Sequence, residues 1–196
     1  MRRAICFLAA CIFATVVSAQ GRSDLAGRGV FHIDFAGLFE AHAAEVVQPA
    51  PDLRILEMDG PVIVEERRRP DGGLRYGAVD QSSGGAVGCL LRVLAEANAV
   101  VKSCPDRVTK DAAMRLNTSL RRAAQFYADN TYPKREISEI EGALSTFITA
   151  RASSAACAAL EDGQLQFLES LSSLSSQRSI GKSLAQPRLP VMSPCS

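Results

Sequence analysis

The spacing of hydrophobic residues predicts helices over most of the second half of the chain. Apolar residues recur there every three or four positions, which places them on one face of an α-helix. This spacing predicts one helix over residues 85–102, one from the Ser103–Asp106 capping pattern to Asn130, and one over 134–161. A fourth helical segment is marked by Leu165, Leu168, Leu171 and Leu174. Short loops between long helices favour antiparallel neighbours, so we expect a bundle of three to four helices.

Residues 53–79 have a different pattern. Three short runs rich in Ile, Val and Leu are separated by Asp59-Gly60 and by Pro70-Asp71-Gly72-Gly73. Because Gly supplies the positive φ that hairpin turns require, both separators predict turns between antiparallel strands. We expect a three-stranded antiparallel β-meander whose apolar face is covered by the helical half of the chain. A second apolar strip on the first long helix, with Val93 and Val100, is the expected contact with this sheet.

The two flanks of these regions are predicted to differ in structure. Residues 31–48 have helical spacing, with Asp34 as the N-cap and Gln48-Pro49 as the end of the helix. Residues 20–30 are expected to form a flexible leader. The tail over 176–196 is rich in Ser and Pro and contains basic but no acidic residues. We expect this tail to be extended and tied down only by Cys195.

The predicted fold is therefore α+β and mainly α. It is one globular domain over residues 31–175, in which a disulfide-stapled antiparallel helical bundle packs on a small three-stranded meander. Length supports one domain, because a chain of this size forms one substantial core rather than two.

The N-terminus has the pattern of a secretory signal peptide. Two arginines precede an uncharged stretch from Ala4 to Val17, and Val17-Ser18-Ala19 matches a cleavage site. The apolar stretch is shorter than the roughly 20 residues that span a bilayer. We therefore expect cleavage after Ala19 and a periplasmic or secreted mature protein without a membrane span. Lipid attachment at Cys11 is the less favoured alternative, because the mature chain would then begin with apolar residues 12–17.

Four cysteines follow the predicted signal peptide, and this even number predicts two disulfides in an oxidising compartment. Cys89 and Cys104 bracket a predicted helix and lie about 22 Å apart along it, whereas a disulfide needs Cα atoms within about 7 Å. In an up-down-up bundle, the ends of the first and third helices lie at the same pole. We therefore predict Cys104–Cys157 and, through the tail, Cys89–Cys195. The pairing of Cys89 with Cys157 and of Cys104 with Cys195 stays open as an alternative.

Composition excludes several classes of function. The 196 residues are 47% hydrophobic and include 22 basic and 21 acidic residues. This apolar content with balanced charge excludes a disordered or collagen-like chain. The near-zero net charge argues against a nucleic-acid-binding protein. Arginine outnumbers lysine 18 to 4, which indicates a GC-rich genome and hence a bacterial origin.

Arg67, Arg68 and Arg69 form the most unusual polar run in the chain. A guanidinium group suits bidentate contact with a carboxylate or phosphate, so these residues are candidate contacts for an anionic ligand or an acidic partner. Glu65 and Glu66 directly precede them. The alternative interpretation is a solvated hairpin end that protects the edge of the sheet.

The sequence contains no catalytic or cofactor motif that we recognise, and no cofactor is expected. His32 and His42 lack metal-ligand spacing, and no nucleophile elbow is present. The Ser82–Gly88 segment lacks the Lys-Ser/Thr of a phosphate-binding loop and is interpreted as a turn before a helix. We therefore expect a non-catalytic binding or protein-interaction module whose partner is a protein or an anionic ligand. The alternative is a small exported hydrolase-type enzyme with a site near His42 and His32.

Overall fold

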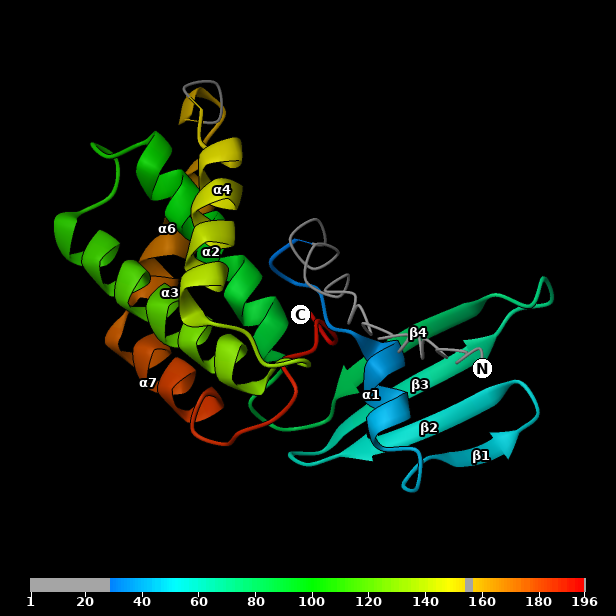
Figure 1. The fold of residues 1–196 in the computed structure, drawn as a ribbon. Coiled ribbons are helices and arrows are strands. Elements are labelled where there is room, and N and C mark those ends of the chain that lie inside the picture. Colours follow the sequence, from blue (N-terminus) through cyan, green and yellow to red (C-terminus); the bar gives the residue numbers. More distant parts are fainter. Residues whose placement is uncertain (1–28, 154–156, 196) are drawn as a thin grey trace, which may run out of the picture.

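A computed structural model describes residues 29–153 and 157–195 of the chain. It has two parts that lie side by side in Figure 1, an antiparallel sheet crossed by one short helix and a group of longer helices. We call residues 35–80 the sheet lobe and residues 87–183 the helical lobe. The predicted signal peptide and most of the predicted leader lie outside the described residues.

The sheet has four antiparallel strands in the order β1-β2-β3-β4. They are β1 (Val47–Ala50), β2 (Leu53–Met58), β3 (Val62–Arg68) and β4 (Leu74–Asp80). Both predicted turns are present, and Gly60 and Gly72 have positive φ angles of 81° and 83° within them. The prediction of three strands was wrong, because β1 adds to the outer edge of β2. Its four residues include Pro49 and pair with an irregular register, so they show no alternation of apolar and polar residues that would predict a strand.

The first helix, α1 (Phe35–Ala41), is shorter than the predicted 31–48. Asp34 is its N-cap, as predicted, and the carboxylate accepts a hydrogen bond of 3.1 Å from the N–H of Gly37. The helix ends at His42, and Val47 belongs to β1 with 63% of its surface exposed. Val46 and Val47 thus lie just before and at the start of β1 rather than at the end of a helical stripe.

It is α1 that covers one face of the sheet, and Figure 1 shows it lying across the strands. The buried Phe39 lies 5.9 Å from the ring of Tyr76 on β4, and Phe35 stacks on the same ring. Leu56, Val62 and Val64 complete this apolar face. The expectation that the long helices cover the sheet was therefore wrong.

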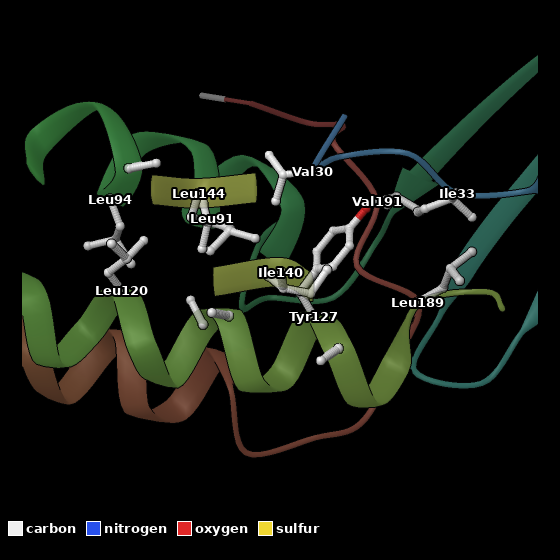
Figure 2. Packing of buried hydrophobic residues seen from close by; sticks show 14 of the residues in the cluster. Val30, Ile33, Leu91, Leu94, Leu120, Tyr127, Ile140, Leu144, Leu189 and Val191 are labelled. Carbon is white, nitrogen blue, oxygen red and sulfur yellow. The ribbon is translucent and has the colours of Figure 1, made fainter. Parts of the chain in front are cut away.

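The helical lobe is built around one central helix. Its helices are α2 (Val87–Ser103), α3 (Lys110–Asn130), α4 (Ile137–Arg151), α6 (Asp162–Ser172) and α7 (Leu174–Ser183). The central helix α3 packs against the other four. Figure 2 shows how side chains of α2, α3 and α4 meet in the core; the labelled ones are Leu91, Leu94, Leu120, Tyr127, Ile140 and Leu144.

Several predicted helix ends were wrong. The second long helix begins at Lys110, where the Thr109 hydroxyl accepts from the N–H of Ala112, and not at the Ser103–Asp106 pattern. That pattern instead closes α2, because the N–H of Cys104 donates to the carbonyl of Val100. The third long helix ends at Arg151 rather than 161.

The C-terminal part of the chain differs most from its prediction. Residues 174–183 form α7, which begins where the Ser173 hydroxyl accepts from the N–H of Ser176. The following C-terminal segment, residues 184–195, runs between the two lobes in Figure 1. Leu189 and Val191 are buried within it, and Figure 2 shows both extending the core toward the sheet. The tail is thus a packed element and is not held by Cys195 alone.

Two glycines let the C-terminal segment approach closely. A Cβ at Gly60 would lie 2.5 Å from the Cβ of Arg188, and a Cβ at Gly88 would lie 2.5 Å from the carbonyl oxygen of Pro190. The N–H of Gly88 also donates to the carbonyl of Val191 over 2.9 Å. Any larger side chain at these positions would collide with the segment.

The structure joins Cys89 to Cys195 and Cys104 to Cys157, which is the pairing expected from helix geometry. The Cα atoms of the two pairs are 5.4 Å and 5.3 Å apart. The first bridge ties the end of the C-terminal segment to the first turn of α2. The second ties the end of α2 to the segment beyond α4. Across the described ranges, no helix combines the length and the apolar character needed to cross a membrane.

Candidate functional site

The three consecutive arginines do not converge on one face of the molecule. Arg67 and Arg68 are neighbours on β3, so their side chains lie on opposite faces of the sheet. Arg69 lies in the turn, where its N–H donates to the carbonyl of Gly73. The Arg67 guanidinium is paired with Glu65 over 3.0 Å. The register places Arg75 of β4 opposite Arg67. This neighbour is not evident from the sequence, because the two arginines are not consecutive.

The two histidines lie away from any described cleft. The Nδ1 atom of His42 lies 3.2 Å from the Glu45 carboxylate on the surface beyond α1. The backbone carbonyl of His32 accepts a hydrogen bond from the Tyr127 hydroxyl. Neither residue lines the two clefts of the helical lobe described below. In the described part of the chain, no cluster of three or more His, Cys, Asp and Glu residues has metal-site geometry.

A buried ion pair connects the lobes. The Arg188 Nε donates to the Asp80 carboxylate over 2.6 Å, and the two side chains are 2% and 0% exposed. Three further guanidinium N–H groups donate to the carbonyls of Ser183, Gln186 and Gly85. Because the two charges neutralise each other and four of the five guanidinium N–H groups donate within the protein, we interpret this cluster as structural.

A second charged cluster lies under α1. The Glu66 carboxylate accepts from Arg54 over 2.9 Å and from the Tyr76 hydroxyl over 3.0 Å, and its side chain is 6% exposed. Burial, together with the hydrogen bond to Glu66 and its charge, raises the pKa of Tyr76 to about 12. The Arg54 guanidinium also lies over the ring of Phe39, 5.1 Å from its centre. The Glu66 carboxylate is therefore paired on both of its oxygens, and this polar cluster takes the place of apolar packing at one end of the sheet.

An open apolar groove runs between α2 and α6. Two clefts form it, with volumes of about 550 and 440 Å³, and Val93 and Phe167 line both of them. The larger cleft is also lined by residues 82–86, by α7 and by the C-terminal segment. Ala97 and Leu168 are buried beneath the smaller cleft, whereas Phe167 is 54% exposed above it. We call these two joined clefts the α2–α6 groove. Val93 was expected to face the sheet and instead faces α6.

The two walls of the groove carry matching helical stripes. From α2 come Leu90, Val93 and Val100, and from α6 come Phe167 and Leu171. Leu90 and Leu171 lie in the larger cleft, so the helices run antiparallel along the groove. Ten residues from Leu90 to Val100 give the groove a length of about 15 Å.

The larger cleft has a basic polar end. None of its lining residues is acidic, and Lys182 is exposed there without an ion pair to any described residue. Ser82 also lines this end, and its hydroxyl oxygen is buried and has no hydrogen-bond partner within the described residues. At the opposite end, Glu96 is neutralised by Arg92 and Arg151 over 3.1 and 3.9 Å. The groove therefore offers an apolar floor and one unneutralised positive charge.

Comparisons with protein-family models, with curated proteins and with solved structures found no match for this chain.

Proposed function

We propose that this protein is a non-catalytic protein-interaction module that binds an amphipathic helix of a partner protein in the α2–α6 groove. The observation that carries the proposal is the apolar stripe on both walls of this groove, which is half-buried on α2 and more than half exposed at Phe167 on α6. Contiguous apolar surface with a polar rim is typical of protein-interaction sites.

The shape of the groove favours a helix over a small molecule. Small-molecule sites are concave and bury about 70–90% of the ligand surface, whereas this groove is open along its length and leaves Phe167 exposed. A helix laid between α2 and α6 would bury its apolar face against Val93 and Phe167 and keep its polar face in water. Such helices use anchors spaced three, four and seven residues apart. The length of the groove fits about three helical turns.

Charge sets the direction of the proposed partner helix. The unneutralised Lys182 at the wide end favours acidic side chains and the negative end of a helix dipole, which is the C-terminus. The partner helix would therefore run parallel to α6 and antiparallel to α2, with its C-terminal turn beside Lys182. Its acidic residues belong in that turn.

A designed helix tests this proposal. The probe is a fluorescein-labelled peptide of roughly 14 residues with leucines at helical anchor spacing and glutamates in its last turn, and binding is read by fluorescence anisotropy. We expect Val93→Glu and Phe167→Glu each to weaken binding about tenfold or more, as the loss of an anchor contact does. Lys182→Glu should weaken this probe and strengthen one whose last turn carries lysines.

Two exposed apolar residues outside the groove provide matched controls. Met114 on α3 and Leu174 on α7 are 62% and 72% exposed and line neither cleft. Met114→Glu and Leu174→Glu add the same charge and should leave the affinity unchanged. If all four glutamate variants bind the probe equally, or if a scrambled peptide of the same composition binds as well, the groove is not the site.

A further inference from the structure

The two edges of the sheet differ in how open they are. β1 is four residues long, contains Pro49 and pairs irregularly with β2, all features that protect an edge from a further strand. β4 is seven residues long, contains no Pro, and pairs with β3 in regular register from Leu74 to Asp80. Its outer side is the open edge of this sheet.

Hydrogen bonds on both sides of β4 show which of its backbone groups point outward. The N–H of Gln81 donates to Pro61, and the N–H of Arg69 donates to Gly73, so the odd-numbered residues of β4 bond toward β3. The N–H of Asp80 instead donates outward to the carbonyl of Ser193, over 2.8 Å. Leu74, Tyr76 and Ala78 share the outward orientation of Asp80.

The contact with Ser193 shows that this edge already accepts an extended backbone at one end. It also limits what else can bind. Full-length antiparallel pairing of two β4 strands from separate copies would place Leu74 of the second copy opposite Asp80, where Ser193 lies. The free edge is therefore the five residues from Leu74 to Ala78, bounded by Ser193 at one end and the Arg69–Gly73 turn at the other.

The side chains along this edge define the chemistry of a strand that fits it. On the open face, Arg75 is exposed and makes no ion pair with a described residue, whereas its register neighbour Arg67 is paired with Glu65. On the face covered by α1, Tyr76 is half-buried and Leu74 is 47% exposed. An added strand gains most from an acidic residue opposite Arg75 and from apolar residues opposite Leu74 and Tyr76.

We propose that β4 binds one extended strand of a partner protein, about five residues long, with alternating apolar side chains and an acidic side chain opposite Arg75. The main-chain hydrogen bonds of Leu74, Tyr76 and Ala78 supply the binding, and Arg75 selects the acidic partner. Leu74–Ala78 line neither cleft of the α2–α6 groove, so this site is independent of that groove.

Amide hydrogen exchange followed by NMR tests the proposal in the mature chain, residues 20–196. The probe is the blocked peptide Val-Thr-Val-Glu-Val, whose Glu falls opposite Arg75 when the peptide adds antiparallel. We expect the amides of Leu74, Tyr76 and Ala78 to gain protection, while those of Gly77 and Val79 keep the protection that β3 already gives them. This alternation is the signature of an added strand and is not produced by binding to the face of the sheet.

Two variants sharpen the test. Ala78→Pro removes one outward N–H without removing a hydrogen bond to β3, and we expect it to weaken binding about tenfold. Arg75→Glu should weaken binding of the Glu peptide about two- to fivefold and strengthen binding of the matching Lys peptide. Arg68→Glu is the control, because it makes the same change of charge on the opposite face of the sheet and should affect neither peptide.

Three outcomes overturn the proposal. Uniform protection along β4 would indicate binding to a face, and no protection at millimolar peptide would leave the edge without a ligand of this class. Protection of Leu74, Tyr76 and Ala78 without peptide, together with a dimer mass in light scattering, would identify a second copy as the occupant.

Discussion

The two lobes of this protein bury different kinds of side chain. The core of the helical lobe is mainly aliphatic and contains Leu91, Leu94 and Leu116, none of which is accessible to solvent. The sheet lobe buries a carboxylate, Glu66, among an arginine and a tyrosine, and α1 is the helix of the described residues that covers its inner face. The helices thus close most of their core by packing on one another, and this core continues toward the sheet through Leu189 and Val191. The sheet, by contrast, is covered by α1 and contains a buried, paired carboxylate.

The lobes are joined mainly by segments outside their helices and strands. The N–H of Asp34 donates to the carbonyl of Tyr132, and the C-terminal segment carries Arg188 into the space beside Asp80. Figure 1 shows this segment running between the sheet and the helices. Because this segment joins the lobes, we expect changes in it to lower the stability of the protein more than changes within either lobe.

The largest effect is expected from Arg188→Met, which leaves the Asp80 carboxylate buried without its partner. Removing one member of a buried ion pair destabilises a protein by about 3–5 kcal/mol. Urea denaturation of the Arg188→Met protein should show a loss of this size, and Asp80→Leu in the same chain should restore part of it. Arg178→Met, on the exposed face of α7, is the control and should change stability by less than about 0.5 kcal/mol. Equal stability of the two single variants would show that the lobes are held together by other contacts.

An intermediate effect is expected where the C-terminal segment touches α2. Gly88→Ala places a methyl group against the carbonyls of Pro190 and Val191 and should cost about 1–3 kcal/mol through overpacking. Gly142→Ala on α4 meets no atom within 4 Å, and it should stabilise the protein by about 0.5–1 kcal/mol because Ala favours a helix. The urea midpoint of each variant is measured, and we expect it to fall for Gly88→Ala and to rise for Gly142→Ala. Stabilisation by both substitutions would mean that the segment does not approach α2.

The last effect is confined to alkaline pH, and it compares one tyrosine from each lobe. Burial raises the pKa of Tyr127 to about 12, and burial together with Glu66 raises the pKa of Tyr76 to about 12. The unfolded chain has ordinary tyrosines near pKa 10, so folding holds these protons more tightly. The stability that they contribute is complete below about pH 10 and is lost as the pH rises toward about 12.

Thermal unfolding measured across that pH range should show this loss of stability. Tyr127→Phe should reduce the pH dependence of stability more than Tyr76→Phe, because Tyr127 is fully buried. Glu66→Gln should lower the pKa of Tyr76 but leave Tyr127 unchanged, as followed by tyrosinate absorbance. A change at both tyrosines would show that the two lobes share one electrostatic environment, contrary to the comparison.

The parts of the fold that were predicted correctly depend on nearby residues. The turns at Gly60 and Gly72 follow from the backbone freedom of glycine, and α2 follows from its apolar period. The disulfide pairing followed from the length of one helix, which keeps Cys89 and Cys104 apart, and from the up-down-up order of the helices, which brings Cys104 to Cys157. The arginine run was assigned to the right hairpin, but strand alternation separates Arg67 from Arg68, so a shared contact with one anion is not supported by this geometry.

What sequence alone determined here is the set of local periods and turns, because each depends on residues a few positions apart. Tertiary structure decided the fate of the C-terminal segment, since the partner of Arg188 lies 108 residues earlier in the chain. It also decided that Val93 faces α6 and that β4 keeps an open edge. These outcomes depend on which surfaces meet after the elements have formed. The periodicity of an element shows which of its faces is apolar, but not which other element packs against that face.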